Sequence, residues 1–387
     1  MLQNNPVEVI SHDPCVLHCK VPVPENLKTG IRMLHDLGAR SCLVMATAAD
    51  RWDPDEVRPV LADSPLPVCG GVFPAVFHGN RLHDDGTLLI GLPVELTTQV
   101  IPGLSTARED LLDQISSGPI GNSTISSLLT FVDSRRQNAE FLVDGLYDVF
   151  GEEVVVTGGG VGSLVDRFVP CIMTNAGLVS DAALLVGLPG HAIHEFEHGW
   201  LTLDGPHVIT AADGTRLETI NHKPAAAVYM EAIERRTGWK FADEEFRKIS
   251  SLYPLGIEQP AGPHLVRDPL SVEGEALICV GEVPEGAIIQ ILKGDRTSLV
   301  DAARRVSQIV ARERLAKRSL DPALLFAWDC ASRRKYLLED FQQELTAIST
   351  QVPEQDQLIG ATTLAEVAST ADGTIRLLNK SLVMMYP

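Results

Sequence analysis

The sequence predicts an α/β protein of two domains, whose sheets are mixed or largely antiparallel and flanked by helices. The chain has 387 residues, 45% of them hydrophobic, which exceeds what one typical domain needs. Asp-Gly-Thr occurs at 85–87, 213–215 and 372–374, each time before a β-prone run, and Asp-Gly in that setting predicts a hairpin. Because hairpins join antiparallel strands, an all-parallel sheet is disfavoured.

Short apolar runs and helical periodicity predict the other elements. A helix is expected from Ser298, where apolar residues recur at helical spacing, and a second apolar stripe runs from Leu337 to Ile348. We interpret both stripes as core faces rather than cofactor-binding surfaces. The expected strands are 41–48, 152–157, 181–188, 275–281, 287–294 and 323–330.

A segment rich in Pro and Gly, 253–269, follows a helical stretch and precedes a new series of strands. We therefore expect a domain boundary within 222–254, which gives domains 1–222 and 223–387. The two halves share a rough order of elements, so an internal duplication is one hypothesis.

Charge and composition limit the classes of function. A net charge of −19 would repel a phosphate backbone, so nucleic acid is an unexpected partner. The first residues lack the basic and apolar regions of a signal peptide, and no apolar run approaches membrane-spanning length, so we expect a cytoplasmic protein without membrane insertion. Seven scattered cysteines suit a reducing compartment and are expected to be mostly buried.

The decapeptide HAIHEFEHGW (191–200) holds three histidines and two glutamates. The order differs from the H-E-x-x-H of zinc proteases, which rules out that interpretation. Its alternation with period two predicts a strand at a sheet edge or cleft. Ligation of a metal or haem by one of these histidines stays open as the alternative.

Three other motifs favour structural roles. TGGGVGS (157–163) lacks the Lys-Ser/Thr of a phosphate loop and the spacing of a dinucleotide fingerprint, so we interpret it as close backbone packing. HDPCVLHC (12–19) has no second ligand pair to complete a zinc site. Cys330, in FAWDCASRR beside Asp329 and Arg333, is expected to be a half-buried structural cysteine, and a thiolate or anion site is the alternative.

Several segments resemble FIST sensory domains. HGWLTLDGPHVITAADGTRLETINHKPAAAVYMEAI (198–233) resembles the end of a FIST N-terminal domain. In ATTLAEVAS (361–369), Glu366 matches the Glu of a Gly-Glu-Ile that is common in the family, but Ala365 replaces the Gly; the comparable CGGVFPAVF (69–77) has no acidic residue. Segments that resemble the FIST C-terminal domain are YPLGI (253–257), VRDPLSV (266–272), GEVPEGAIIQILKGDRTSL (281–299), LLFAWDC (324–330) and NKSLVMM (379–385).

The resemblance implies an intracellular, non-enzymatic sensory protein that binds a small ligand. It would act on a separate signalling protein, such as a histidine kinase or a cyclic-dinucleotide enzyme. Some stand-alone bacterial members of the family are haem proteins that sense nitric oxide, so the resemblance also implies haem as an alternative cofactor. The candidate haem ligands, in order, are His198, His194 and His18.

We expect the ligand in a cleft lined by strand ends and loops. For an anionic ligand such as an amino acid, Arg267 and Arg296 would donate hydrogen bonds, and Asp268 and Asp295 would orient them or accept from an ammonium group. Cys330 and Glu366 would line the wall. Two alternatives stay open: a local ion pair of Arg267 with Asp268, and a thiol-dependent enzyme acting through Cys330 or Cys69, for which no base adjoins either thiol.

Overall fold

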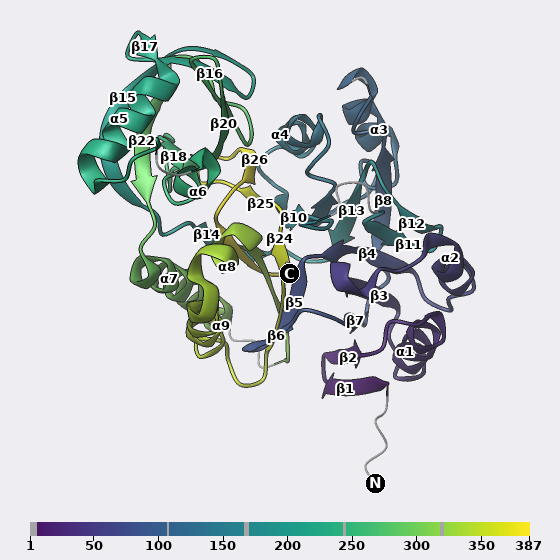
Figure 1. The fold of residues 1–387 in the computed structure, drawn as a ribbon. Coiled ribbons are helices and arrows are strands. Elements are labelled where there is room, and N and C mark those ends of the chain that lie inside the picture. Colours follow the sequence, from purple (N-terminus) through teal and green to yellow (C-terminus); the bar gives the residue numbers. More distant parts are fainter. Residues whose placement is uncertain (1–5, 107, 166–169, 243–244, 318–320) are drawn as a thin grey trace.

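The computed structural model describes residues 6–106, 108–165, 170–242, 245–317 and 321–387. Four sheets, most of them mixed in strand direction, carry helices on their outer faces (Figure 1), which confirms the predicted α/β class. The helices are α1 (Pro24–Asp36), α2 (Pro54–Ala62), α3 (Leu111–Ser117), α4 (Ala139–Phe150), α5 (Ala225–Thr237), α6 (Phe246–Ser250), α7 (Arg296–Ala316), α8 (Ala331–Leu337) and α9 (Phe341–Ser349).

Each sheet has a defined strand order. The first is β1 (Val7–His12), β2 (Cys15–Cys19), β7 (Thr87–Leu92), β3 (Ser41–Thr47), β4 (Val68–Phe73), β11 (Ile172–Thr174) and β12 (Gly177–Val179). The second is β26 (Ile375–Leu378), β25 (Glu366–Ser369), β10 (Val155–Gly160), β9 (Ser127–Val132), β13 (Ala182–Leu188) and β8 (Thr97–Pro102). The third is β14 (Ile193–Glu197), β27 (Leu382–Tyr386), β23 (Leu324–Cys330), β24 (Gln357–Thr363), β5 (Ala75–His78) and β6 (Arg81–His83).

One strand-helix-strand unit occurs three times. The parallel pairs β3–β4, β9–β10 and β23–β24 each lie beside an antiparallel strand, β7, β13 and β27 respectively. A glycine holds the same register position in each pair: Gly70 opposite Val44, Gly158 opposite Thr130 and Gly360 opposite Ala327. The chain therefore contains three copies of this unit, where the sequence had suggested an internal duplication.

The repeated glycine explains the Gly-rich motif of the second unit. A Cβ at Gly158 would lie 1.9 Å from the carbonyl oxygen of Thr130, and a Cβ at Gly70 would lie 1.9 Å from that of Val44. Both glycines also have a φ near +150°, which other residues rarely adopt. TGGGVGS is thus a site of close backbone packing, as its sequence indicated.

The three units exchange hairpins. Hairpin β11–β12 of the second unit pairs with β4 of the first, β25–β26 of the third pairs with β10 of the second, and β5–β6 of the first pairs with β24 of the third. The exchange closes a ring. The two halves of the sequence therefore cannot separate without breaking strand pairs.

A lobe is inserted into the third unit between β14 and α7. It contains α5, α6 and the fourth sheet, and it lies at the upper left of Figure 1. The strands, in order, are β19 (Leu265–Arg267), β18 (Leu255–Ile257), β22 (Ile288–Lys293), β15 (Leu201–Asp213), β16 (Arg216–Ile220), β21 (Ala276–Cys279) and β20 (Pro269–Glu273), and β17 (Lys223–Pro224) pairs with β16.

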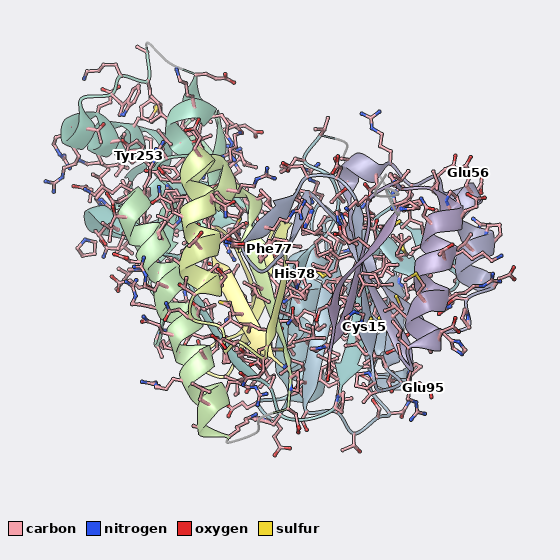
Figure 2. The ribbon with its side chains drawn as sticks, turned by 90° about the horizontal axis from the view of Figure 1, so that it is seen from below. Cys15, Glu56, Phe77, His78, Glu95 and Tyr253 are labelled. Atoms are coloured by element: carbon pink, nitrogen blue, oxygen red, sulfur yellow. The ribbon has the colours of Figure 1, made fainter. Side chains whose placement is uncertain are left out.

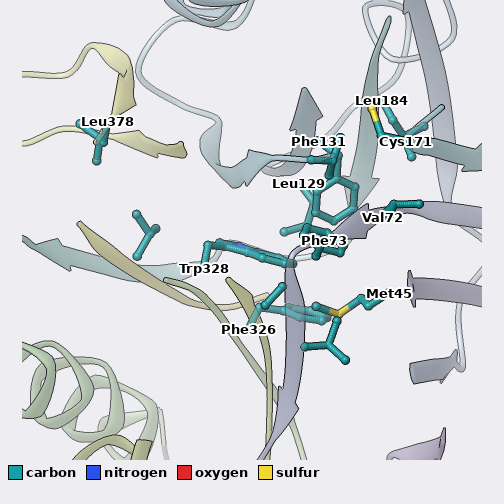
Figure 3. Packing of buried hydrophobic residues seen from close by; sticks show 14 of the residues in the cluster. Met45, Val72, Phe73, Leu129, Phe131, Cys171, Leu184, Phe326, Trp328 and Leu378 are labelled. Atoms are coloured by element: carbon teal, nitrogen blue, oxygen red, sulfur yellow. The ribbon is translucent and has the colours of Figure 1, made fainter. Parts of the chain in front are cut away.

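The central core lies where the three units meet. Met45, Phe131 and Trp328 hold equivalent positions on β3, β9 and β23 and belong to one buried cluster (Figure 3). The Trp328 ring stacks on Phe73 at 6.0 Å and on Phe326 at 5.9 Å between centroids, and Phe131 meets it edge-on at 5.3 Å. Because this centre is tightly packed, we expect ligand sites nearer the surface of the protein.

Separate hydrophobic clusters join the helices to the outer sheet faces. One cluster includes residues of α7, α9 and the third sheet, and another includes residues of α3, α4 and the second sheet. Seen from below, α7 and α9 lie on one side of the sheets and α1 and α2 on the other, with Phe77 and His78 of β5 between them (Figure 2). The predicted apolar stripe from Leu337 to Ile348 is interrupted, because Leu338 has a φ of 54° and separates α8 from α9.

Two of the three hairpin predictions are confirmed and one is wrong. The turns at 213–215 and 372–374 join β15 to β16 and β25 to β26. The turn at 85–87 makes no hairpin, because β6 pairs with β5 and β7 pairs with β2 and β3, in another sheet. The strand expected at 152–157 runs from Val155 to Gly160, and β14 lies at a sheet edge as the histidine-rich motif predicted.

Candidate functional site

The structure places the expected site residues in three neighbourhoods. Cys330 and Glu366 lie together in a buried polar network at the end of β23. Arg267 lines a cavity beside α4. Arg296 lines another cavity, beside α8, so the two arginines do not share a hollow.

Cys330 and Glu366 form a buried pair whose side chains are hydrogen-bonded to each other, so Cys330 is more enclosed than the half-buried position expected for it. The Glu366 carboxyl also accepts from the Thr363 hydroxyl at 2.8 Å and from the Ser381 backbone N–H at 3.1 Å. Burial raises the pKa of Glu366 to about 8 and raises the pKa of the Cys330 thiol even further above its ordinary range. A thiol that stays protonated at neutral pH is a poor nucleophile, which weighs against thiol catalysis here.

Arg333 anchors the same network and was not among the expected site residues. Its side chain is fully buried, lies 3.1 Å from the Asp329 carboxylate and also pairs with Glu344. It further donates to the backbone carbonyls of Leu299, at 3.1 Å, and His198. The sequence signal is the spacing of Arg333 three residues after Cys330, which places it one helical turn beyond a strand end.

Asp268 is buried and lies 3.4 Å from the ammonium of Lys380, which also sits 4.5 Å from the centre of the Trp200 ring. Lys380 donates to the Ser251 carbonyl as well. Arg267 has different partners from its neighbour Asp268. The local ion pair of these two residues, which was the alternative to a ligand-binding role, is therefore replaced by separate contacts.

A cavity of about 440 Å³ lies between α4 and the inserted lobe, and we call it the interlobe cavity. Arg267 forms part of its wall, and its guanidinium is extensively bonded: Nε donates to the Glu282 carbonyl at 3.0 Å, and Nη1 to the Leu377 carbonyl at 3.3 Å. Its Nη2 donates to Glu140 of α4. The ionisable residues of the wall are Glu140, Asp144, Glu282, Glu285, Arg267 and Arg376.

Asp144 and Arg376 keep hydrogen-bonding capacity in this cavity. One Asp144 oxygen accepts from Arg376 Nη1 at 3.0 Å, whereas Asp144 Oδ1 and Arg376 Nε are buried without a hydrogen-bond partner in the described residues. Burial raises the pKa of the Asp144 carboxyl to about 6, despite the opposing effect of Arg376. This ion pair therefore contains one buried acceptor and one buried donor whose hydrogen-bonding capacity is unused.

Asp295 and Arg296 lie at the start of α7. The Asp295 carboxylate accepts from the Ser298 backbone N–H at 2.9 Å and caps the helix. Arg296 pairs with Asp340 at 2.7 Å and lines a cavity of about 760 Å³ beside α8. Asp295 therefore has a structural role, and Arg296 belongs to a different surface from Arg267.

The three candidate haem ligands are all engaged in the fold. His198 is buried, its Nδ1 accepts from the Trp200 backbone N–H at 2.8 Å, and burial lowers its pKa to about 3. His194 bonds to the Ser369 carbonyl at 3.0 Å, and His18 packs 4.2 Å from the His83 ring. None of them lines the interlobe cavity or the cavity beside α8, so neither cavity offers a histidine ligand for haem. Nε2 of His198 and Nε2 of His18 are buried without a hydrogen-bond partner in the described residues.

The described part of the chain contains no group of three or more His, Cys, Asp or Glu residues placed to hold a metal ion. It also contains no helix long and apolar enough to cross a membrane.

Comparison with known protein families identifies two domains. The FIST N domain matches residues 41–223, and the FIST C domain matches residues 225–369. No curated protein matches the chain. FIST domains are sensory modules and are not known as catalytic domains. The chain therefore belongs to the family of proteins that carry a FIST N domain followed by a FIST C domain.

Proposed function

We propose that the protein senses a small ligand in the interlobe cavity and transmits its binding to a separate signalling protein. The observation that carries the proposal is that charged residues of both FIST domains line one cavity of about 440 Å³. That volume falls in the usual range for small-molecule sites. Glu140 and Asp144 come from the FIST N domain, and Arg267 and Glu282 from the FIST C domain.

The unpartnered atoms of the cavity indicate a zwitterionic ligand such as an amino acid. When a side-chain rearrangement exposes these buried atoms to the cavity, Asp144 Oδ1 would accept from an ammonium group and Arg376 Nε would donate to a carboxylate. Both atoms lose water on burial, so a ligand that pairs with both relieves an unfavourable state. Arg267, by contrast, shapes the wall, because its donors already serve Glu140 and three backbone carbonyls.

Ligand binding at this cavity would change contacts that join the lobes. Glu140 on α4 accepts from both Arg267 and the Glu282 backbone N–H, the latter at 2.9 Å. A ligand that competes for Glu140 or Asp144 shifts the position of α4 relative to the inserted lobe. The output would then reach a separate protein such as a histidine kinase or a cyclic-dinucleotide enzyme.

A thermal-shift screen of amino acids, followed by calorimetric titration of those that stabilise the protein, tests the proposal. Asp144→Asn keeps the shape of the side chain and removes the charge that the ammonium requires, so we expect it to weaken binding at least about tenfold. Glu231→Gln on the exposed side of α5 is the matched control and should bind like the wild type. Equal binding by Asp144→Asn, or no binding by any amino acid, would contradict the proposal.

A further inference from the structure

Helix α8 presents different residues to its two sides. Arg333 points inward, where Asp329, Glu344 and two backbone carbonyls hold it without exposure to solvent. The next two residues, Arg334 and Lys335, line the cavity of about 760 Å³ on the outer side. The same short helix therefore connects the buried network to an open surface.

The lining of the open surface contains more cations than acids. Arg296, Arg334 and Lys335 line it against a single acid, Glu339, although the chain as a whole has a net charge of −19. The interlobe cavity, in contrast, has four acids and two arginines in its wall. Arg296 and Arg334 each pair with one aspartate outside the cavity lining, whereas no ion pair of Lys335 is found among the described residues. Lys335 can therefore pair directly with a negatively charged partner, whereas Arg296 and Arg334 would exchange Asp340 and Asp84 for it.

Large apolar side chains surround these cations. Leu164 and Leu338 line the same cavity and are 58% and 63% exposed, and Val165, next to Leu164, is 94% exposed. Leu338 also holds a φ of 54° and a ψ of −119°, a conformation that costs a branched residue energy and that glycine would adopt freely. An exposed leucine in an unfavourable backbone conformation contributes little to stability, and its side chain is open to contact with a partner.

We propose that Leu164, Arg296, Arg334, Lys335 and Leu338 form a docking surface for an acidic segment of a partner protein that also carries apolar side chains. A small anion would pair with the cations and leave the leucines exposed, whereas an acidic segment with apolar residues covers both. The proposal goes beyond ligand sensing, because it concerns a surface that shares no lining residue with the interlobe cavity.

Fluorescence anisotropy with three labelled peptides of equal length tests the proposal on the whole protein. One peptide combines Glu and Leu, one replaces each Leu by Ser, and one replaces each Glu by Lys. We expect the Glu/Leu peptide to bind the most tightly, the Glu/Ser peptide more weakly and the Lys/Leu peptide not at all. Added salt should weaken the binding, because the cations are exposed.

Two variants and one control locate the binding. Lys335→Glu reverses an exposed charge and should weaken the Glu/Leu peptide about tenfold. Leu338→Gly removes the leucine and relaxes its backbone, so it should weaken binding about fivefold while the protein stays at least as stable as the wild type. Arg312→Glu, at an exposed position of α7 outside this cavity, should leave binding unchanged.

Three outcomes would overturn the proposal. One is that no acidic peptide binds the wild type, and a second is that Lys335→Glu and Arg312→Glu weaken binding equally. The third is that the Glu/Ser peptide binds as tightly as the Glu/Leu peptide and inorganic pyrophosphate displaces both, which would assign the surface to small anions. If Lys335→Glu binds amino acids as tightly as the wild type does, the docking surface and the interlobe cavity are separate sites.

Discussion

Replacing Glu366 by Gln should remove a large pH dependence of stability. Glu366 is fully buried, and burial raises its pKa from 4.5 to about 8. The folded state therefore keeps a proton that the unfolded state releases above pH 4.5, so the carboxyl lowers the stability progressively as pH rises from 4.5 through 8. The difference of roughly 3.5 pKa units corresponds to about 5 kcal/mol at most, of which about 3 kcal/mol falls between pH 5 and pH 8.

The hydrogen bonds around Glu366 explain why Gln is a suitable replacement. The Thr363 hydroxyl lies close to both Glu366 and the Asp329 carbonyl, at 2.8 and 3.2 Å. It can donate to the Asp329 carbonyl and accept from the side-chain amide that Glu366→Gln introduces, as it would from a protonated carboxyl. The Ser381 N–H still finds an oxygen acceptor. The variant thus mimics the neutral acid and keeps the hydrogen bonds to Thr363 and Ser381.

Urea unfolding at pH 5, 6, 7 and 8 measures the effect. We expect Glu366→Gln to have nearly wild-type stability at pH 5 and to exceed the wild type at pH 8 by about 3 kcal/mol. The exposed substitution Glu231→Gln should follow the wild type at every pH. Two results would refute the assignment of a neutral Glu366. One is that the free energy of unfolding depends on pH in the same way for Glu366→Gln and the wild type, and the other is that Glu366→Gln is less stable than the wild type by an equal amount at all four pH values.

The remaining predictions concern packing, charge and the cofactor. Arg333→Met leaves Glu344 and Asp329 buried without their cation, so urea unfolding should show a loss of about 3 to 5 kcal/mol; a loss below about 1 kcal/mol would contradict the buried network. Gly158→Ala forces a Cβ against a carbonyl oxygen and should cost more than about 3 kcal/mol, whereas Gly214→Ala, in open space, should cost about 1 kcal/mol; equal costs would argue against the shared backbone approach of the repeats. Ammonium binding in the interlobe cavity should strengthen as pH rises through about 6, because Asp144 ionises there, and a titration series that is flat from pH 5 to 7.5 would exclude Asp144 as the acceptor. Addition of haem should give no spectrum of a histidine-ligated iron, since no candidate histidine lines the interlobe cavity or the cavity beside α8; a Soret band that His198→Ala abolishes would contradict this.

Local patterns in the sequence predict most elements of this fold. The apolar runs at 41–48, 181–188 and 323–330 are central strands, and the helix expected from Ser298 is α7. The prediction at 85–87 was wrong because a turn fixes only where the chain reverses, not which strand it then pairs with. The hairpin exchange between units depends on contacts across more than 100 residues, such as Ala75 with Thr362, which no local pattern encodes.

The site residues also divide into those that the local sequence predicts and those that depend on long-range contacts. Cys330 and Glu366 were expected in the wall of one cleft; they contact each other in the buried interior, where the end of β23 in the third sheet meets the start of β25 in the second. Glu140 and Asp144, in contrast, lie on an ordinary amphipathic helix, where acidic residues usually face solvent. Their role depends on the inserted lobe, which brings Arg267 to Glu140 from 127 positions away. The three repeats also single out Glu366. At the equivalent position the other two units have an apolar residue, Val76 in the first and Ile172 in the second.

Hydrogen–deuterium exchange with and without the tightest-binding amino acid tests ligand sensing at the interlobe cavity most directly. We expect slower exchange in α4 and in residues 281–285 on ligand addition, and no such change in Asp144→Asn at the same ligand concentration. Protection confined to other parts of the chain, with α4 and 281–285 unaffected, would contradict it.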